Sequence, residues 1–238
     1  MLTQRQAMSS PSPKKALFAQ FATVARALGS EHRLDLLEHL AQAEQSVELL
    51  AQRTGIPLAS VSQHLQALRK AGLVSARRES RYIFYAIADD SVLVLLASLR
   101  EVAERQLAEV ERIVAGYFRG RDSLEPISRK ELSARIKDGL VTVLDVRPEY
   151  EFASGHLPGA INVPLAHLRK RLAELPRRQE VIAYCRGPWC VLAFEAIALL
   201  RKAGRKARRL DGGLPEWKIA GLPVETSSSI AGKTLERE

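Results

Sequence analysis

The first part of the chain has the hydrophobic periodicity of amphipathic helices. Apolar residues recur at helical spacing over residues 17–28, and Gly29 ends that segment. Three further helices are predicted up to Gly72, and each begins after or at a residue suited to a helix N-terminus: Ser30, Ser46 and Pro57. Residues 17–72 are therefore expected to be mainly helical.

A short β-like stretch interrupts this helical pattern. Residues 73–88 place β-branched and aromatic residues on both sides of a polar Arg-Glu-Ser-Arg sequence, which predicts a β-hairpin. One long helix is predicted after the hairpin, with apolar positions at Leu95, Leu99, Val102, Val110, Ile113, Val114 and Tyr117. The N-terminal half is therefore expected to be mainly α, with a single hairpin.

In the second half of the chain the pattern changes to alternating strands and helices. VTVLDV (141–146) and VIAYC (181–185) are predicted strands, and a helix (190–204) is followed by a further strand (206–213). Strand, helix and strand at this spacing predict a parallel α/β sheet. The predicted organisation is, in order, a disordered lead-in (1–16), an N-terminal domain (17–118), a linker (119–125), a C-terminal domain (126–226) and a flexible tail (227–238).

Composition narrows the class of protein. With 46% hydrophobic and 26% charged residues, the 238-residue chain has enough apolar side chains for globular cores. It contains no apolar run of the roughly 20 residues that span a bilayer, and its first residues lack the apolar region of a secretory signal. Two cysteines do not make a disulfide framework, so a cytoplasmic location without membrane contact is predicted.

The formal net charge of +9 is spread over both halves of the chain. Excess positive charge favours anionic partners such as nucleic acid or small oxyanions. Ordinary solubility accounts for the same charge equally well. Charge alone therefore does not decide between these alternatives.

The helical half contains the pattern of a DNA-reading winged helix-turn-helix. Two short helices are joined across residues 54–57, the second buries Val61, Leu65 and Leu68, and a basic hairpin follows. The polar face left on the second helix is suited to base edges and phosphates: Ser60, Ser62, Gln63, His64 and Gln66. Phosphate contacts are predicted from basic residues at the helix end and on the wing: Arg69, Lys70, Arg77, Arg78 and Arg81. A winged helix that binds protein is the alternative, and the basic wing argues against it.

Residues 17–100 resemble the ArsR family of bacterial repressors. The resemblance rests on LGSEHRLDLLEHL and on VELLAQRTGIPLASVSQHLQALRKAGLVSARRESRYIFYAI. It implies a homodimer, formed through the first and last helices of this domain, that binds double-stranded operator DNA and releases it when an inducer binds. Metal-sensing relatives often have Cys-x-Cys where this chain has residues 47–49, and the last helix has no histidine. No metal site is therefore predicted, His32 and His39 are interpreted as surface or packing residues, and the signal is expected to enter elsewhere.

Cys185 is a candidate reactive cysteine. It follows an apolar strand and precedes a small loop, residues 186–190, that leads into a helix. Unpaired backbone N–H groups and the positive end of a helix dipole at that place favour the thiolate form. Gly187 allows the loop to turn, and Arg186 adds a cation. A buried structural cysteine is the alternative, but it requires neither neighbour.

Residues 126–225 resemble the rhodanese family through three separated motifs. These are VLDVRPEYEFASGHLPGAINVP, YCRG and LDGGLPEWKIAGLPV. The resemblance implies a doubly wound α/β domain whose loop cysteine accepts sulfane sulfur as a persulfide, without a cofactor. It assigns the nucleophile to Cys185 and the cradle for a small sulfur-containing anion or persulfide donor to the loop Arg186, Gly187, Pro188, Trp189 and Cys190.

The other residues of these motifs are expected to support the loop. Asp145 and Arg147 are expected to organise structure, His156 to be architectural and Trp217 to lie in the core. The loop lacks the terminal arginine of related phosphatases, which argues against phosphatase activity. The sequence leaves two interpretations of Cys190 open: a resolving thiol that pairs with Cys185, or a small apolar residue where the helix packs.

Three functions follow from these patterns. The first is a DNA-binding regulator, expected to be a repressor, that takes up sulfane sulfur on Cys185 to sense sulfur or redox state. The second is an active thiosulfate or persulfide sulfurtransferase tethered to an auto-regulatory DNA-binding domain. The third is arsenite binding by the two thiols, which would be a sparse soft-metal site.

Overall fold

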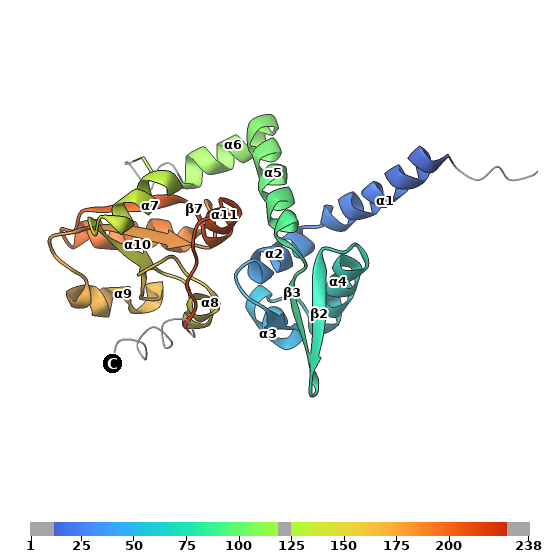
Figure 1. Cartoon of the computed structure of the whole chain (residues 1–238), viewed down its shortest axis with the longest axis horizontal. Coiled ribbons are helices and arrows are strands. Elements are labelled where there is room, and N and C mark those ends of the chain that lie inside the picture. The colour runs from blue at the N-terminus through green and yellow to red at the C-terminus, as the bar shows by residue number, and fades with distance from the viewer. Residues whose placement is uncertain (1–11, 119–124, 228–238) are drawn as a thin grey trace, which may run out of the picture.

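The computed structural model describes residues 12–118 and 125–227, which form two domains joined side by side (Figure 1). The N-terminal domain contains helices and a three-stranded antiparallel sheet, and the C-terminal domain contains a four-stranded sheet between helices. The mainly α and α/β classes predicted for the two halves are confirmed. No helix of the described segments has the length and apolar character required to cross a membrane.

Four helices open the N-terminal domain: α1 (Pro13–Leu28), α2 (Glu31–Leu40), α3 (Val47–Thr54) and α4 (Leu58–Lys70). Ser46 accepts a hydrogen bond from the Leu49 backbone N–H, which confirms it as the cap of α3. Ser30 precedes α2 but makes no side-chain capping bond. α1 begins inside the segment that was expected to be a disordered lead-in, because the Ser12 side chain caps it and Pro13 suits a first helical position.

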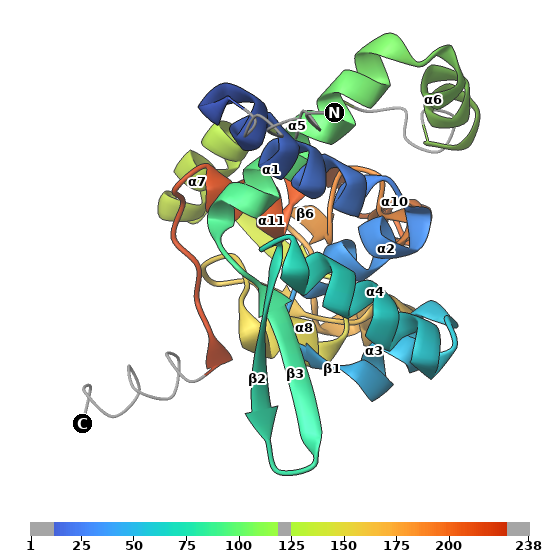
Figure 2. The same ribbon diagram turned by 90° about the vertical axis from the view of Figure 1, so that its right-hand side faces the viewer.

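The predicted hairpin is the wing of this domain. Its strands β2 (Val74–Glu79) and β3 (Tyr82–Ile87) pair antiparallel, and β1 (Gln45–Ser46) adds to the other side of β3. Ser80 at the tip has a φ of 55°, which is the left-handed conformation of a tight turn. The hairpin projects well beyond the body of the domain in both views (Figures 1 and 2).

The prediction of one long helix after the hairpin is wrong, because this segment is broken at Leu107. α5 (Asp90–Gln106) ends just before Leu107. α6 (Ala108–Ile113) then starts in a new direction and is followed by a π-helical turn (Val114–Phe118). Leu107 has the extended angles φ −106° and ψ 106°, so its carbonyl leaves the α5 ladder and accepts a hydrogen bond from Val110 N–H instead. No glycine or proline marks this break, and the apolar periodicity continues through it.

One apolar core holds the helices and the wing of the N-terminal domain together. The residues at its centre have no exposed surface: Leu36, Leu37, Leu50, Val61, Leu65 and Leu68. α4 packs on this core from the side that is turned away from the C-terminal domain (Figures 1 and 2). The C-terminal domain therefore does not cover the outer face of α4.

The C-terminal sheet has the strand order β5-β4-β6-β7, and all of its strands are parallel. The strands are β4 (Val141–Asp145), β5 (Ile161–Asn162), β6 (Glu180–Cys185) and β7 (Ala207–Gly213). The helices are α7 (Arg129–Lys137), α8 (Glu149–Ser154), α9 (Leu165–Arg171), α10 (Val191–Lys202) and α11 (Leu214–Ile219), with a 3-10 turn (Leu172–Glu174) after α9.

Each face of this sheet is covered, which confirms the doubly wound arrangement. α9 and α10 bury Leu168 and Ile197 on one face, and α7 and α11 bury Leu132 and Trp217 on the other. At the start of the domain, Ile127 forms a parallel bridge with Leu210 on β7. The first and last parts of this domain are therefore joined by main-chain hydrogen bonds.

Candidate functional site

The candidate site is the loop of residues 186–190, between β6 and α10. β6 carries Cys185 to the carboxyl edge of the sheet, where it is fully buried, and α10 begins directly after Cys190. β7 ends against this loop at Gly213. A Cβ at that position would lie 2.4 Å from the Cys185 carbonyl oxygen and 2.5 Å from the Gly187 nitrogen. Only glycine permits this close approach, which gives the second glycine of LDGGLPEW a physical role.

The two cysteines of the loop form a disulfide bond. The Cα atoms of Cys185 and Cys190 are 6.1 Å apart, and four residues lie between the two positions in the chain. The Cys190 backbone N–H donates to the Gly187 carbonyl at 3.2 Å, which closes the loop as a tight turn. Of the two interpretations of Cys190, the geometry fits a partner for Cys185. The thiolate expected at Cys185 can therefore exist only after this bond is opened.

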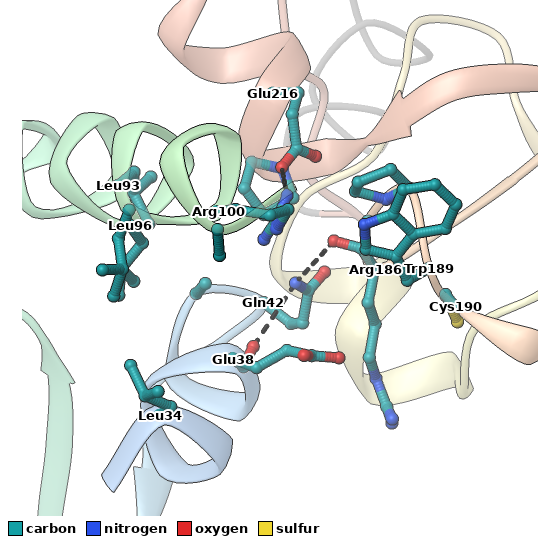
Figure 3. Close-up of a pocket in the computed structure, with 16 residues that line it drawn as sticks. Leu34, Glu38, Gln42, Leu93, Leu96, Arg100, Arg186, Trp189, Cys190 and Glu216 are labelled. Carbon is teal, nitrogen blue, oxygen red and sulfur yellow. Dashed lines mark hydrogen bonds and ion pairs between the residues drawn. The ribbon is translucent and has the colours of Figure 1, made fainter. Parts of the chain in front are cut away.

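The Arg186 side chain does not place a free cation beside the sulfur atoms. Its Nε lies 2.9 and 3.1 Å from the two carboxylate oxygens of Glu151, which is fully buried on α8. Tyr150 also donates to this carboxylate, and burial together with that hydrogen bond raises the pKa of Tyr150 to about 12. The side chain of Arg186 extends away from Trp189 (Figure 3). The expectation that Arg186 adds a cation to the thiol is therefore corrected: Glu151 offsets its charge.

A buried polar network lies under the loop. Arg147 Nε donates to both oxygens of Asp145 at 3.0 and 3.1 Å, and Arg147 Nη2 donates to the Gly155 carbonyl at 2.8 Å. The Tyr184 hydroxyl donates to the same carboxylate, and burial and the Asp145 charge raise the pKa of Tyr184 well above its usual value. Asp145 and Arg147 thus join β4, β6 and the turn after α8.

His156 and Trp217 lie away from the loop sulfur atoms, in the body of the C-terminal domain. The His156 ring is buried, stacks on Phe152 with ring centres 3.7 Å apart, and places Nδ1 2.8 Å from the Phe152 carbonyl oxygen. Trp217 is buried, and its indole N–H donates to the Pro223 carbonyl at 2.8 Å. Neither residue lines the cavity described next.

A cavity of about 300 Å³ lies between part of the loop and the N-terminal domain (Figure 3). Its N-terminal wall comes from α2 and α5, and its C-terminal wall from the loop and α11. The residues that line it are Leu34, Glu38, Ala41, Gln42, Leu93, Leu96, Leu99, Arg100, Ala103, Arg186, Gly187, Pro188, Trp189, Cys190, Pro215 and Glu216.

Direct hydrogen bonds join the loop and its neighbours to the N-terminal domain. The Trp189 indole N–H donates to Glu104 on α5 at 2.6 Å, and Arg100 donates to Glu216 on α11 at 2.7 Å. Gln42, in the turn after α2, donates to the Arg186 carbonyl at 3.2 Å and accepts from Arg147, also at 3.2 Å. The candidate cysteine site is thus connected to the same helices that support α4 and the wing.

The sequence did not point to these connecting residues. Gln42, Arg100 and Glu104 lie in ordinary helical or loop sequence of the N-terminal half, far in the chain from their partners. Glu151 offered only a weak signal, as an acidic residue next to aromatic ones in the first C-terminal motif. Their role depends on how the two domains pack, which no local pattern encodes.

The residues predicted to read DNA divide into two groups on α4. Gln63, Gln66, Arg69 and Lys70 are exposed on the outer face. Ser60, Ser62 and His64 lie at its margins and are half-buried. The His64 ring is close to that of His32, with centres 5.5 Å apart. The exposed glutamines are therefore best placed to reach into a major groove.

The basic residues of the wing are not equivalent. Arg77 donates to Glu44 at 2.9 Å and also to Glu79, so two carboxylates offset its charge. Arg78 and Arg81 are exposed at the tip, where Arg78 bonds the Ser80 carbonyl and Arg81 the Tyr82 hydroxyl. The expectation of a free phosphate-binding cation therefore suits Arg78 and Arg81 better than Arg77.

Residues 12–118 and 125–227 contain no cluster of three histidine, cysteine, aspartate or glutamate side chains that could hold a metal ion. Both cysteines of the chain belong to the disulfide. A soft metalloid could bind the sulfur atoms only after reduction.

Comparison with known proteins assigns both domains. Residues 28–76 match the family model described as a helix-turn-helix domain, and residues 128–220 match the one described as a rhodanese-like domain. The HTH-type transcriptional regulator Rv0324 of Mycobacterium tuberculosis is 45% identical over 217 residues, which are 91% of this chain and 95% of that protein. A sulfurtransferase of Allochromatium vinosum is 32% identical over 100 residues, 41% of this chain and 92% of its own.

Among solved structures, a winged helix-turn-helix DNA-binding domain from Mycobacterium bovis is similar to the N-terminal part. That domain is described as homodimeric and as part of a possible ArsR-family transcriptional regulator. It shares 43% sequence identity with this chain, covers 41% of this chain and 91% of its own, and superposes with a TM-score of 0.39.

Proposed function

The chain belongs to the HTH-type transcriptional regulators in which a rhodanese-like domain follows the DNA-binding domain, and from that premise we propose that its cysteine loop senses sulfane sulfur. Sulfur uptake at Cys185 changes the affinity of α4 and the wing for operator DNA, and the regulator acts as a repressor. The observation that carries this proposal is the contact of the loop with α5 and with Gln42 in the turn after α2.

Opening or lengthening the bond between Cys185 and Cys190 moves the residues between them. Trp189 is adjacent to Cys190, and its hydrogen bond to Glu104 transmits such a movement to α5. Only two residues separate α5 from the wing strand β3, so a shift of α5 reaches the DNA-binding elements. Allosteric coupling requires that the modified loop favours one of two arrangements of the domains. The cavity between the domains leaves room for a second arrangement.

The regulator acts as a homodimer in this proposal. α1 exposes three large apolar side chains, Leu17 at 57%, Phe18 at 56% and Phe21 at 62%. α5 exposes Leu95 and Val102 in the same way. Exposed large apolar side chains gathered on a helix are typical of an interaction site, and a second copy presents the same helices.

The direct test of sulfur sensing is the operator affinity of the full chain in three states. Fluorescence anisotropy on DNA from the upstream region of its own gene compares the disulfide form, the reduced form and protein treated with a sulfane-sulfur donor. We expect a change of about tenfold or more between reduced and donor-treated protein, as for a typical allosteric coupling. Cys185→Ser abolishes the change and retains DNA binding. An unchanged affinity across all three states, at fixed salt, contradicts the proposal.

A second prediction concerns the contact between the domains. Glu104→Ala removes the acceptor of the Trp189 indole N–H, and Glu104 does not line the cavity, so sulfur uptake on Cys185 remains while its effect on operator affinity falls at least severalfold. Glu101→Ala is the matched control, because Glu101 lies on the same helix, is exposed and pairs with Arg105. Mass spectrometry measures uptake and anisotropy measures affinity. Equal responses from both variants would show that the hydrogen bond between Trp189 and Glu104 does not transmit the signal.

Sulfurtransferase activity is the second candidate function. The likeness of the C-terminal domain to the sulfurtransferase of Allochromatium vinosum favours it. Sustained transfer of sulfur from thiosulfate to cyanide by the reduced protein, abolished in Cys185→Ser, is the expected result if the domain is an enzyme. A single sulfur atom taken up without turnover indicates a sensor.

A further inference from the structure

The cavity between the domains gives the two sulfur atoms different access. Cys190 lines the cavity and is partly exposed, whereas Cys185 is fully buried behind the loop. A molecule in the cavity therefore meets Cys190 first, because Cys185 does not line the cavity. The position of the cavity makes it the natural place for the sulfur donor, and its lining identifies the kind of donor.

Most of the lining is apolar. Four leucines from α2 and α5 form one wall, and Trp189 with two prolines forms the opposite one: Leu34, Leu93, Leu96, Leu99, Pro188 and Pro215. Ligand sites with such walls bind the apolar part of a ligand and use a few polar groups to orient it. The lining therefore favours a donor with an apolar body.

The charged groups of the cavity do not suit an inorganic dianion. Arg100 is paired with Glu216, and Arg186 is paired with Glu151 behind the loop. Glu38 adds another carboxyl, whose pKa is raised by desolvation. A thiosulfate ion would lose its hydration shell here without gaining an unpaired cation, which is unfavourable.

We propose that this cavity binds an organic hydropersulfide, R–S–SH, whose R group is a compact apolar chain or ring, and presents its terminal sulfur to Cys190. The inference rests on the proposed function and names the donor class of the same site. A volume of about 300 Å³ is at the lower end of ligand pockets, so it suits a single ring with a short chain. A peptide persulfide is too large and too polar for these walls.

The sulfur transfer balances from the disulfide form that the structure shows. The anion R–S–S⁻ attacks Cys190 Sγ, the bond between the two cysteines breaks, and Cys185 leaves as a thiolate. The Cys185 thiolate then attacks the sulfur atom bound to Cys190 Sγ. R–S⁻ leaves and takes up a proton. The products are a trisulfide between Cys185 and Cys190 and the thiol R–SH, so one sulfur atom is inserted and no other oxidant or reductant takes part.

The test compares three donors on the full-length disulfide protein. The probes are 2-phenylethyl hydropersulfide, glutathione persulfide and thiosulfate, and mass spectrometry follows the gain of one sulfur atom in the peptide with both cysteines. We expect the phenylethyl donor to react at least about tenfold faster than either of the others at equal concentration, as a matched apolar pocket predicts.

Two variants of α5 locate the binding site. Leu99→Trp fills the cavity from an exposed lining position and slows the phenylethyl donor about tenfold. Val94→Trp is the matched control, because Val94 is also exposed on α5, at 49% against 40% for Leu99, but does not line the cavity. Ala103→Leu fills the cavity from another position. If Leu99→Trp slows the donor only because it disturbs dimerisation, Ala103→Leu leaves the rate unchanged. Calorimetry with unreactive 2-phenylethyl methyl sulfide detects binding that both filling variants abolish.

The outcomes separate this inference from the proposed function. If thiosulfate or glutathione persulfide reacts as fast as the phenylethyl donor, or if the two filling variants leave its rate unchanged, the inference is overturned and sulfur sensing stands. If no donor adds sulfur to the cysteine pair in either its reduced or its disulfide form, the proposed function fails as well.

Discussion

Arg147→Met is expected to destabilise the C-terminal domain by about 3–5 kcal/mol, because it removes one partner of a buried ion pair. The carboxylate of Asp145 would remain fully buried with the Tyr184 hydroxyl and the Arg147 backbone N–H as its partners. The Gly155 carbonyl would lose its donor as well. Since a domain is stable by about 5–15 kcal/mol, this loss is a large part of the total.

Denaturant unfolding of the full chain measures this effect. Trp217 is buried in the core of the C-terminal domain, whereas Trp189 contacts Glu104 on α5, so intrinsic tryptophan fluorescence in a Trp189→Phe background reports the unfolding of the C-terminal domain. Arg171→Met is the control, because Arg171 pairs with Glu174 on the surface and its loss costs less than about 0.5 kcal/mol. Equal midpoints for the two variants would show that the buried network contributes little to stability.

The second large effect is expected from Gln63→Ala on α4. Gln63 is exposed on the outer face of the helix, and a bidentate contact of glutamine with adenine contributes about 1–3 kcal/mol. A homodimer presents α4 twice, so operator binding weakens by about 2–6 kcal/mol. The affinity for a scrambled DNA of the same length stays unchanged, because phosphate contacts carry no sequence information.

Gln52→Ala is the control for this prediction. Gln52 is also an exposed glutamine on a helix, but it lies on α3 and not on the outer face of α4. Anisotropy titrations at one salt concentration, with both DNA sequences, measure the affinities. A loss on operator and scrambled DNA alike would assign Gln63 to phosphate contact instead of base reading.

The features of the fold that the sequence predicted are those that depend on local chemistry. Ser46 caps α3, the polar tip of residues 78–81 turns the wing, and the three motifs of the second half give the parallel sheet. Each of these features depends on neighbouring residues in the chain. The break of the long helix at Leu107 does not, since nothing in the local sequence disfavours a continuous helix there. The early start of α1 depends on a serine followed by proline, which was assigned to the lead-in.

The candidate site was only partly predictable for the same reason. Cys185 and its loop follow from a strand, a small loop and a helix in succession. The contacts that give the site its connection to DNA binding join residues about 80 to 150 positions apart, as for Trp189 with Glu104 and Gln42 with Arg186. Charge offset is similarly non-local: Glu44 neutralises Arg77, and Glu151 neutralises Arg186. Residue type indicates a cation, but only packing shows whether it is free.

The bridge between Ile127 and Leu210 joins the start of the C-terminal domain to its last strand, so this domain, the second to leave the ribosome, is completed late in synthesis. The C-terminal sheet cannot close until β7 has been synthesised, whereas the core of the N-terminal domain is complete once α5 has emerged. At about 5–20 residues per second, the roughly 100 residues between these points take about 5–20 s to translate. A newly made chain therefore has a folded DNA-reading surface for several seconds before its cysteine loop exists, and a transcript cut short in this interval encodes a DNA-binding protein without its sensor.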